Sequence, residues 1–212
     1  MERARVYAAI AAERLAIADL IGDLDEVQLS TPSLCGDWDV KTVGAHLASV
    51  LQSGTFRISL LGLRHGGANG AMAELARHEA ANSAAEIAAH LRALADHTYF
   101  RPPPQAAGLL AEVLCHSGDV RIPLGLPFSP SPDLVSVAMG FMTGPVPLGM
   151  VPLRRLRGIR FCANDIDAHW GRGAEIHGSG ALLMMAAVGR LPALDGLSGP
   201  GVTVLRKRIS GP

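Results

Sequence analysis

Hydrophobic residues recur at helical spacing through the first 150 residues of the chain. The first helix is expected over 6–24, where the apolar positions that share one face are Val6, Ile10, Ile17, Leu20, Ile21 and Leu24. Further helices are expected after Asp39, after Ser83, through 109–116 and after Ser131, where apolar runs of 3.6-residue period follow capping or loop residues. Several helices joined by short or moderate loops predict a mainly α fold, built as a bundle.

The pattern changes after Pro152, where apolar and polar residues begin to alternate. The alternation over 159–164 is typical of a strand. The further elements expected there are a second strand at 174–177 and helices at 182–188 and 202–209. His169–Trp170, between the two strands, is expected to form a turn. The sequence therefore predicts a helical bundle over residues 1–150 and a small α/β module over residues 151–212.

The segment from Leu134 to Leu153 has twenty residues without a charge, so a membrane span has to be considered. Pro145, Pro147 and Pro152 interrupt its second half. Because proline cannot continue a regular helix, we expect a short buried helix that runs into a turn-rich connection.

Three residues on two of the predicted helices have the character of one metal site: His46, Glu112 and His116. Glu112 and His116 are four residues apart, so on a helix they lie on one face, one turn from each other. The apolar neighbours at helical spacing are Val43, Leu47 and Val50 for the first histidine, and Leu109 and Val113 for the other two residues. Two imidazoles and a carboxylate are a ligand set of catalytic zinc, which leaves a fourth position for water or substrate. A divalent cation would compensate the burial of all three side chains together.

These residues also have simpler interpretations. A core histidine such as His46 is often only hydrogen-bonded, and Glu112 with His116 can form an ordinary i,i+4 pair. Asp119 lies three residues after His116, on the same helix face. It can accept the second ring N–H of a ligating histidine, or it can form a salt bridge with Arg121. Both interpretations of Asp119 stay open.

The composition limits the partners of the protein. Nineteen basic and nineteen acidic residues cancel, so there is no excess of positive charge to neutralise nucleic-acid phosphates. Hydrophobic residues make up 49% of the chain and charged residues 18%, which favours a buried core. The three cysteines form no C-x-x-C motif, and the amphipathic N-terminal segment is unlike a signal peptide. We expect a cytoplasmic monomer or homodimer that binds neither nucleic acid nor a membrane.

Two longer stretches match the motifs of a known family. The first is Thr31-Pro-Ser-Leu-Cys-Gly-Asp-Trp-Asp-Val-Lys-Thr-Val-Gly-Ala-His46-Leu, which fits T-P-x-x-C-x-x-W-x-V-x-x-x-x-x-H-L. The second is Glu112-Val-Leu-Cys-His116-Ser-Gly-Asp119-Val-Arg121-Ile-Pro-Leu-Gly, which fits E-x-x-x-H-x-x-D-x-R-x-x-L-G. Both motifs resemble those of the mycothiol-dependent maleylpyruvate isomerase family, which belongs to the DinB-like metal-binding bundles. The stretch from Leu191 to Leu205 looks like the C-terminal tail of that family.

The resemblance implies a DinB-like four-helix bundle that holds zinc, or another divalent metal, through His46, Glu112 and His116. It also implies mycothiol as a thiol cosubstrate. In the founding type of enzyme an arginine of the C-terminal domain contributes to catalysis, and Arg190 is the position here that matches it best. The simpler interpretation of Arg190 is a cation at the end of a helix. The 63–105 region carries no clear family motif, so the resemblance does not specify a substrate.

Two classes of function follow from these observations. The first is a metal-dependent enzyme that activates a low-molecular-weight thiol for isomerisation of, or S-transfer to, a small electrophile, with Asp119 and Arg190 as candidate catalytic residues. No protein nucleophile is evident, since Cys115 is expected to be a buried hydrophobe and Cys35 is expected to pack in the core or line the site entrance. The second class is a non-catalytic protein of the same fold that binds a metal or small ligand. A fourth protein ligand on the metal would favour the second class.

Overall fold

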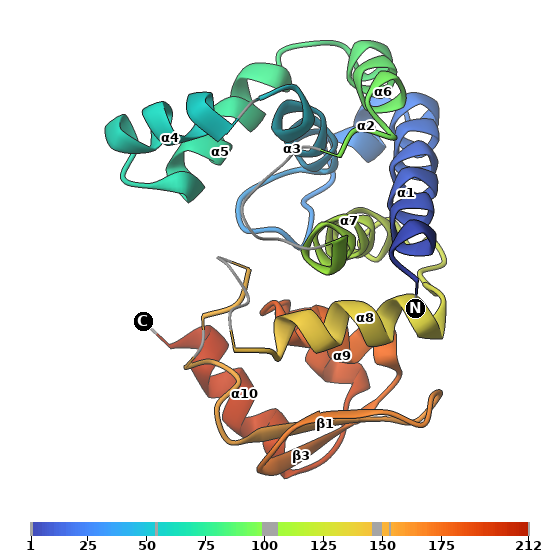
Figure 1. Cartoon of the computed structure of the whole chain (residues 1–212), viewed down its shortest axis with the longest axis vertical. Coiled ribbons are helices and arrows are strands. Elements are labelled where there is room, and N and C mark those ends of the chain that lie inside the picture. The colour runs from blue at the N-terminus through green and yellow to red at the C-terminus, as the bar shows by residue number, and fades with distance from the viewer. Residues whose placement is uncertain (1, 54, 99–105, 146–149, 153, 212) are drawn as a thin grey trace. The chain divides into compact units, whose positions relative to one another are not determined.

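The computed structural model describes residues 2–53, 55–98, 106–145, 150–152 and 154–211. Its elements, labelled in Figure 1, are α1 (Arg3–Asp23), α2 (Glu26–Leu29), α3 (Val40–Gln52), α4 (Thr55–Arg64), α5 (Ala68–Glu79), α6 (Ala84–Ala93), α7 (Ala106–Arg121), α8 (Pro132–Met142), β1 (Ile159–Ala163), β2 (His169–Gly171), β3 (Ala174–Gly178), α9 (Gly180–Ala187), the 3₁₀ helix η1 (Leu191–Gly196) and α10 (Pro200–Ser210).

The chain forms two compact units, and the division between them falls inside α7. The N-terminal unit comprises Arg3–Pro104 and Asp119–Leu126. The C-terminal unit comprises Gln105–Gly118 and Pro127–Pro212, together with the first two residues. Each unit is described below by itself.

The N-terminal unit is built around α3, which contacts α1, α2, α5 and α6. Figure 1 shows α3 between α5 on one side and α6 on the other. From Val43 to Leu51 every residue of this helix is buried. A helix that is buried on all sides is expected where neighbouring helices surround it. Gly44 allows α1 and α3 to approach closely, because a Cβ at this position would lie 3.0 Å from the Cδ1 and Cγ1 atoms of Ile21 on α1.

The apolar face of α1 carries a buried cation. Arg14 is 5% exposed, among the buried residues Ile10, Ile17 and Ile21 of the same helix. Its Nη1 donates to the backbone carbonyls of Ala95, at 2.9 Å, and His97, at 2.8 Å. These carbonyls follow the end of α6, so the guanidinium fastens the chain beyond α6 to α1.

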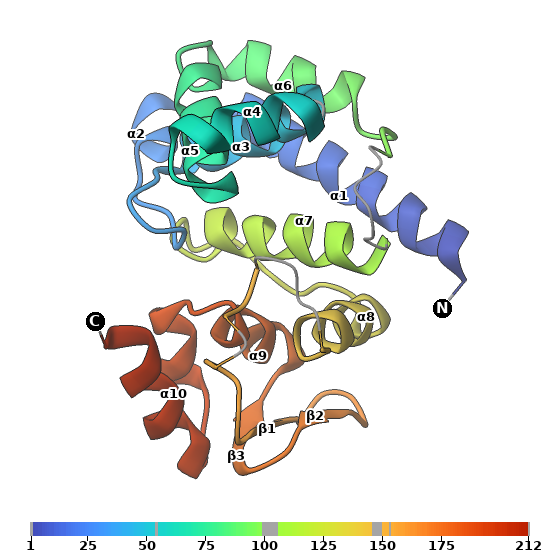
Figure 2. The same ribbon diagram turned by 60° about the vertical axis from the view of Figure 1, so that its left-hand side comes forward.

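The C-terminal unit contains a sheet of three strands in the order β2-β1-β3. β1 is antiparallel to β2 and parallel to β3. Ile159 and Phe161 of β1 and Ile176 of β3 are buried on one face of this sheet. The contacts of β1 and β3 are with α9 and α10, while α8 packs on α9. In both views α8 and α9 lie on the same side of the sheet (Figures 1 and 2).

The short connection from β2 to β3 depends on two glycines with positive φ. Gly171 has φ 79° and Gly173 has φ 130°. A Cβ on Gly171 would lie 2.4 Å from the carbonyl oxygen of Ile159, and a Cβ on Gly173 would lie 2.1 Å from that of Gly158. The chain therefore passes the start of β1 at a distance that only glycine permits.

Two glycines of α7 also mark close packing inside the C-terminal unit. A Cβ at Gly108 would lie 3.0 Å from Cζ of Phe141 on α8. A Cβ at Gly118 would lie 2.6 Å from Sδ of Met185 on α9. The missing side chains make room for a large apolar residue from each neighbouring helix.

The structure confirms the predicted mainly α fold with a small α/β part at its C-terminal end. The expected strand at 159–164 is β1, and the expected second strand is β3. One expectation was wrong: His169–Trp170 forms β2 rather than a turn, because its backbone pairs with Cys162 and Phe161 of β1. The boundary predicted at residue 150 stays a prediction.

The uncharged segment after Leu134 begins as the expected short helix. α8 ends at Met142, and Thr143 is its C-cap. Residues 146–149 and 153 lie outside the described part of the chain. Among the described residues, no helix has both the length and the apolar character that crossing a membrane requires.

Candidate metal centre

The loop before α3 is a compact turn that presents Cys35. The N–H of Ser33 donates to the carbonyl of Trp38 at 2.9 Å, and the N–H of Trp38 donates to the carbonyl of Cys35 at 3.3 Å. The N–H of Cys35 donates to Oγ of Ser33 at 3.0 Å. Gly36, next to the cysteine, has φ 60°, which favours glycine. The turn leaves Cys35 half-buried.

Asp39 fixes the start of α3 and hence the position of His46 along this helix. Its Oδ1 accepts the N–H of Thr42 at 2.8 Å, as an N-cap does. His46 lies two turns further on and is 4% exposed. Its ring is 4.9 Å from that of Trp38, with 42° between the planes. Trp38 is thus a packing partner of His46, and it belongs to the same loop as Cys35.

The end of α7 is fastened to this loop through its backbone. The N–H of Leu34 donates to the carbonyl of Asp119 at 3.2 Å. Asp119 is fully buried, with 0% of its surface exposed. α7 is one continuous helix, so Glu112 and His116 hold fixed positions relative to Asp119. These three side chains follow one another at i, i+4 and i+7 on one face of the helix.

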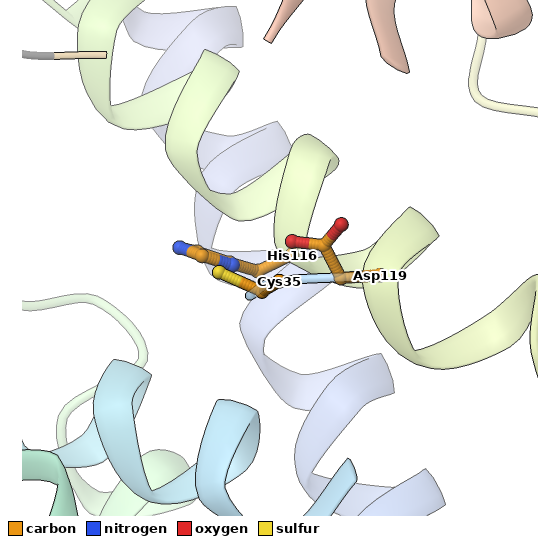
Figure 3. A group of neighbouring side chains, drawn as sticks. All are labelled: Cys35, His116 and Asp119. Atoms are coloured by element: carbon orange, nitrogen blue, oxygen red, sulfur yellow. The ribbon is translucent and has the colours of Figure 1, made fainter. Parts of the chain in front are cut away.

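Cys35, His116 and Asp119 come together as a group. Their ligand atoms, a sulfur, a ring nitrogen and a carboxylate oxygen, all lie within 4.8 Å of one another. Figure 3 shows Cys35 and His116 side by side, with Asp119 one turn further along the helix of His116. Cys35 and His116 are half-buried, and Asp119 is buried.

This group offers the donor atoms that a zinc-class cation prefers. Thiolate, imidazole and carboxylate all bind Zn²⁺, and the first two favour it over Mg²⁺ or Ca²⁺. Asp119 also suits an indirect role. A carboxylate that accepts the second ring N–H of a ligating histidine orients the ring and raises its basicity.

The structure brings some of the residues predicted from the sequence together, and for the others it gives only the helix on which they lie. His116 and Asp119 lie together, as expected from their shared helix face. His46 lies on α3, and Glu112 lies on α7, where it is half-buried. The convergence of His46, Glu112 and His116 on one metal stays a prediction.

The sequence favours core packing for Cys35, with the site entrance as the alternative, and the structure places it beside His116. Helical periodicity cannot predict the position of a residue in a turn. Only the T-P-x-x-C motif could have indicated that Cys35 belongs to the site. Cys115, by contrast, is 2% exposed and is the buried hydrophobe that its position on the helix predicts.

Arg190 belongs to the C-terminal unit, at the N-cap of η1. Its N–H donates to the carbonyl of Met185 at 3.0 Å, at the end of α9. Arg155, which the sequence does not single out, lies close by and donates from Nη1 to the carbonyl of Val188 at 3.0 Å. Burial, and then the positive charge of Arg190, lower the pKa of Arg155 below its ordinary value.

Comparison with known proteins identifies the family of the chain. The profile of the mycothiol maleylpyruvate isomerase N-terminal domain matches residues 10–121. The chain belongs to this family. No curated protein matches the chain.

Two solved structures share the fold. One is the crystal structure of the mycothiol-dependent maleylpyruvate isomerase, with a TM-score of 0.54 and 16% sequence identity. The other is a histidine-to-alanine variant of that isomerase, with a TM-score of 0.55 and the same identity. In both comparisons the match covers 90% of this chain and 92% of the other chain. At this identity the likeness concerns the fold.

The family match ends at Arg121, which is the last residue of α7. It therefore contains all of the candidate metal-centre residues: Cys35, His46, Glu112, His116 and Asp119. Arg155 and Arg190 lie beyond it. The family match therefore does not extend to the two arginines.

Proposed function

We propose that the protein is a metal-dependent enzyme that activates mycothiol for isomerisation of, or S-transfer to, a small electrophilic molecule. The observation that carries this proposal is the match of residues 10–121 to the mycothiol maleylpyruvate isomerase N-terminal domain. The group formed by Cys35, His116 and Asp119 supports it, because the group lies within the matched region and offers metal-binding atoms.

The proposed ligands are His46, Glu112 and His116, and their chemistry fits a zinc-class cation. Two neutral imidazoles and one carboxylate leave the site a net charge of +1, which favours an anionic thiolate as the next ligand. Zn²⁺ bound by this donor set would lower the pKa of a bound thiol from about 8.5, so that thiolate is present at neutral pH.

Other residues of the chain would orient the two histidine rings and exclude water from the site. Asp119 would accept a ring N–H of His116 and hold the tautomer in which the other nitrogen binds metal. Trp38 would hold the His46 ring through the packing that it makes with it. Burial of Asp119 and of His46 would keep water from competing for these contacts.

In the isomerisation, the mycothiol thiolate adds to one carbon of an activated double bond and forms a C–S bond. The bond between the two former alkene carbons is then single and can rotate. Expulsion of the thiolate breaks the C–S bond and restores the double bond in the other geometry, so the thiol is regenerated. In an S-transfer the C–S bond stays, and a proton or a leaving group balances the charge.

Metal titration of purified variants tests the assignment. His46→Ala, Glu112→Gln and His116→Ala should each weaken zinc affinity and lose mycothiol-dependent turnover in parallel, because each removes one ligand of three. His78→Ala is the matched control, since His78 is exposed on α5. Metal-loaded protein that neither binds mycothiol by calorimetry nor turns over any thiol–electrophile pair would contradict the enzyme proposal.

One observation favours the second candidate, a protein whose metal is not catalytic. The sulfur of Cys35 lies within 4.8 Å of the ring nitrogen of His116. A cysteine bound as the fourth ligand would close the site to a thiol cosubstrate. Under the enzyme proposal Cys35→Ser leaves zinc affinity nearly unchanged, whereas under the second candidate it weakens affinity as strongly as His116→Ala does.

A further inference from the structure

Two strands of the C-terminal unit, β1 and β3, bring a second set of metal-binding side chains together. Cys162 lies on β1, and Glu175 and His177 lie on β3. Their ligand atoms all lie within 4.8 Å of one another. All three residues belong to the C-terminal unit, and none of them is part of the candidate metal centre.

The register of the sheet fixes this grouping. In the parallel pairing of β1 and β3, Cys162 lies opposite His177. Residues that lie opposite each other on neighbouring strands project from the same face of the sheet. Glu175 precedes His177 by two residues and so shares that face. The arrangement depends on backbone hydrogen bonds rather than on flexible side chains.

A fourth candidate ligand lies on the other side of Cys162. In the antiparallel pairing of β1 and β2, Cys162 lies opposite His169. The same rule places His169 on the face of Cys162. One row across the sheet therefore reads His169, Cys162, His177. The buried residues Phe161 and Ile176 alternate with this row and occupy the opposite face.

The separations among Cys162, Glu175 and His177 can be compared with those of a tetrahedral site. Nε2 of His177 lies 3.0 Å from Oε2 of Glu175. With Zn–N and Zn–O distances of about 2.0–2.1 Å, two ligand atoms of a tetrahedron lie roughly 3.3 Å apart, and a sulfur and a nitrogen roughly 3.6 Å. The cysteine sulfur therefore has to move by at most about 1.2 Å, and the ring of His169, which lies outside this group, has to turn toward it. Side-chain rotations provide both movements. The side chains of Glu175 and His177 are 44% and 39% exposed, so an ion can reach them.

We propose that this face is a metal site in which Cys162, Glu175 and His177, with His169 as the fourth ligand, bind a divalent cation of the zinc class. A thiolate and a carboxylate balance the charge of the cation, and both imidazoles bind as neutral rings. Four protein ligands leave no position for a substrate, so the metal is structural. It joins β2, β1 and β3 across a sheet of short strands.

Without metal, Glu175 takes part in ordinary pairing. Its Oε2 contacts His177, and its Oε1 lies 3.7 Å from Nη1 of Arg160. Metal binding would replace the contact with His177, while Arg160 could continue to orient the carboxylate. The experiment has to separate this ion-pair cluster from a metal site.

Cobalt substitution distinguishes the two, because Co²⁺ bound to thiolate gives a sulfur-to-metal charge-transfer absorption. The measurement uses full-length Cys35→Ser protein, in which Cys162 and the buried Cys115 are the remaining thiols. The absorption should appear on addition of Co²⁺, disappear when Zn²⁺ is added, and be absent from the Cys35→Ser/Cys162→Ser double variant. Absence of the band in Cys35→Ser protein, or its persistence after Cys162→Ser, overturns the proposal.

Competition with a chromophoric chelator then tests the other ligands. In the Cys35→Ser background, Glu175→Gln, His177→Gln and His169→Gln should each weaken Co²⁺ affinity by at least about 10–100-fold, the loss that even an indirect partner of a ligand causes. Asp167→Asn, in the exposed turn between β1 and β2, is the control and should leave affinity unchanged. Unchanged affinity in His169→Gln would remove it as a ligand, and unchanged affinity in the other two would overturn the site.

Discussion

Arg14 of the N-terminal unit carries a buried guanidinium, and burial of a charged group costs free energy unless the group is hydrogen-bonded. It is 5% exposed and donates to two carbonyls beyond α6. Hydrogen bonds from a charged group contribute roughly 1.5–3 kcal/mol each, and loss of a buried partner leaves the carbonyls unsatisfied. The contribution of Arg14 to stability depends on where the chain beyond α6 lies, and the sequence of α1 does not encode that position.

Arg14→Ala should lower the free energy of unfolding by about 2–4 kcal/mol, from the lost hydrogen bonds and the cavity. Arg92→Ala is the matched control, because its ion pair with Asp19 is exposed on both sides. That change should cost no more than about 1 kcal/mol. Urea unfolding of the two variants measures the difference, and equal losses would show that burial of Arg14 has no special weight.

A second prediction at this scale concerns Asp119. If it accepts a ring N–H of the ligand His116, Asp119→Asn should weaken zinc affinity by about 10–100-fold. The fold should persist, because the backbone carbonyl that receives the Leu34 N–H is unchanged. Asp37→Asn, an exposed acid of the same loop, is the control. A loss larger than that of Glu112→Gln would instead make Asp119 a ligand itself.

At the scale of elements, α1 and α3 approach each other closely at Gly44. Gly→Ala in a helix gains up to about 1 kcal/mol of propensity, while overpacking costs roughly 1–3 kcal/mol. Gly140 on α8 has open space around a Cβ and serves as the control. Gly44→Ala should therefore be less stable than Gly140→Ala by about 1–3 kcal/mol in urea unfolding.

A double variant checks the cause of that loss. Ile21→Val removes Cδ1, one of the two atoms that would lie 3.0 Å from a Cβ at Gly44. Gly44→Ala should therefore cost less in the Ile21→Val background than in the wild-type protein. Additive effects of the two changes would show that Ile21 is not the obstacle.

The capping box at the start of α6 gives a prediction for the pH dependence of stability. Hydrogen bonds from the side chain and then from the backbone N–H of Ser83 lower the pKa of Glu86 below its ordinary value of 4.5. A carboxyl whose pKa is lower in the folded state stabilises the fold above its unfolded pKa, and this contribution is lost as pH falls through the folded pKa. Glu86→Gln should therefore reduce the loss of stability on acidification below about pH 4.5. Glu26→Gln, at the exposed first turn of α2, should not.

At the scale of the whole molecule, the open question is whether the C-terminal unit takes part in the proposed reaction. We predict that Arg190→Ala leaves zinc affinity unchanged, because Arg190 is outside the predicted ligand set, and impairs turnover only if the C-terminal unit contributes to the site. Arg190 and Arg155 bring two positive charges together at the end of α9. Arg157→Ala, which removes an exposed arginine of the same unit, is the control.

The separate values of kcat and KM sharpen this test. A fall in kcat at constant metal content would assign Arg190 to the reaction, and a rise in KM alone would assign it to substrate binding. Unchanged kinetics would leave Arg190 with the structural role of a cation at the end of a helix.

The sequence by itself determined the elements with strong periodicity. The apolar stripe of α1, the caps Asp39 and Ser83, and the alternation in β1 all predicted elements that the structure contains. Local propensity and amphipathic spacing are properties of a short segment, so they can be recognised without tertiary information. The shared helix face of Glu112, His116 and Asp119 was predictable for the same reason.

Only the tertiary structure decided which residues from different elements meet. Cys35 joins His116 through a turn held by hydrogen bonds, and Trp38 packs on His46. His169 forms a strand because β1 offers it a partner, although its own sequence reads as a turn. Cys162 lies opposite His177 because of the strand register. Contacts between distant segments depend on the packing of whole elements, and neither periodicity nor capping encodes that packing.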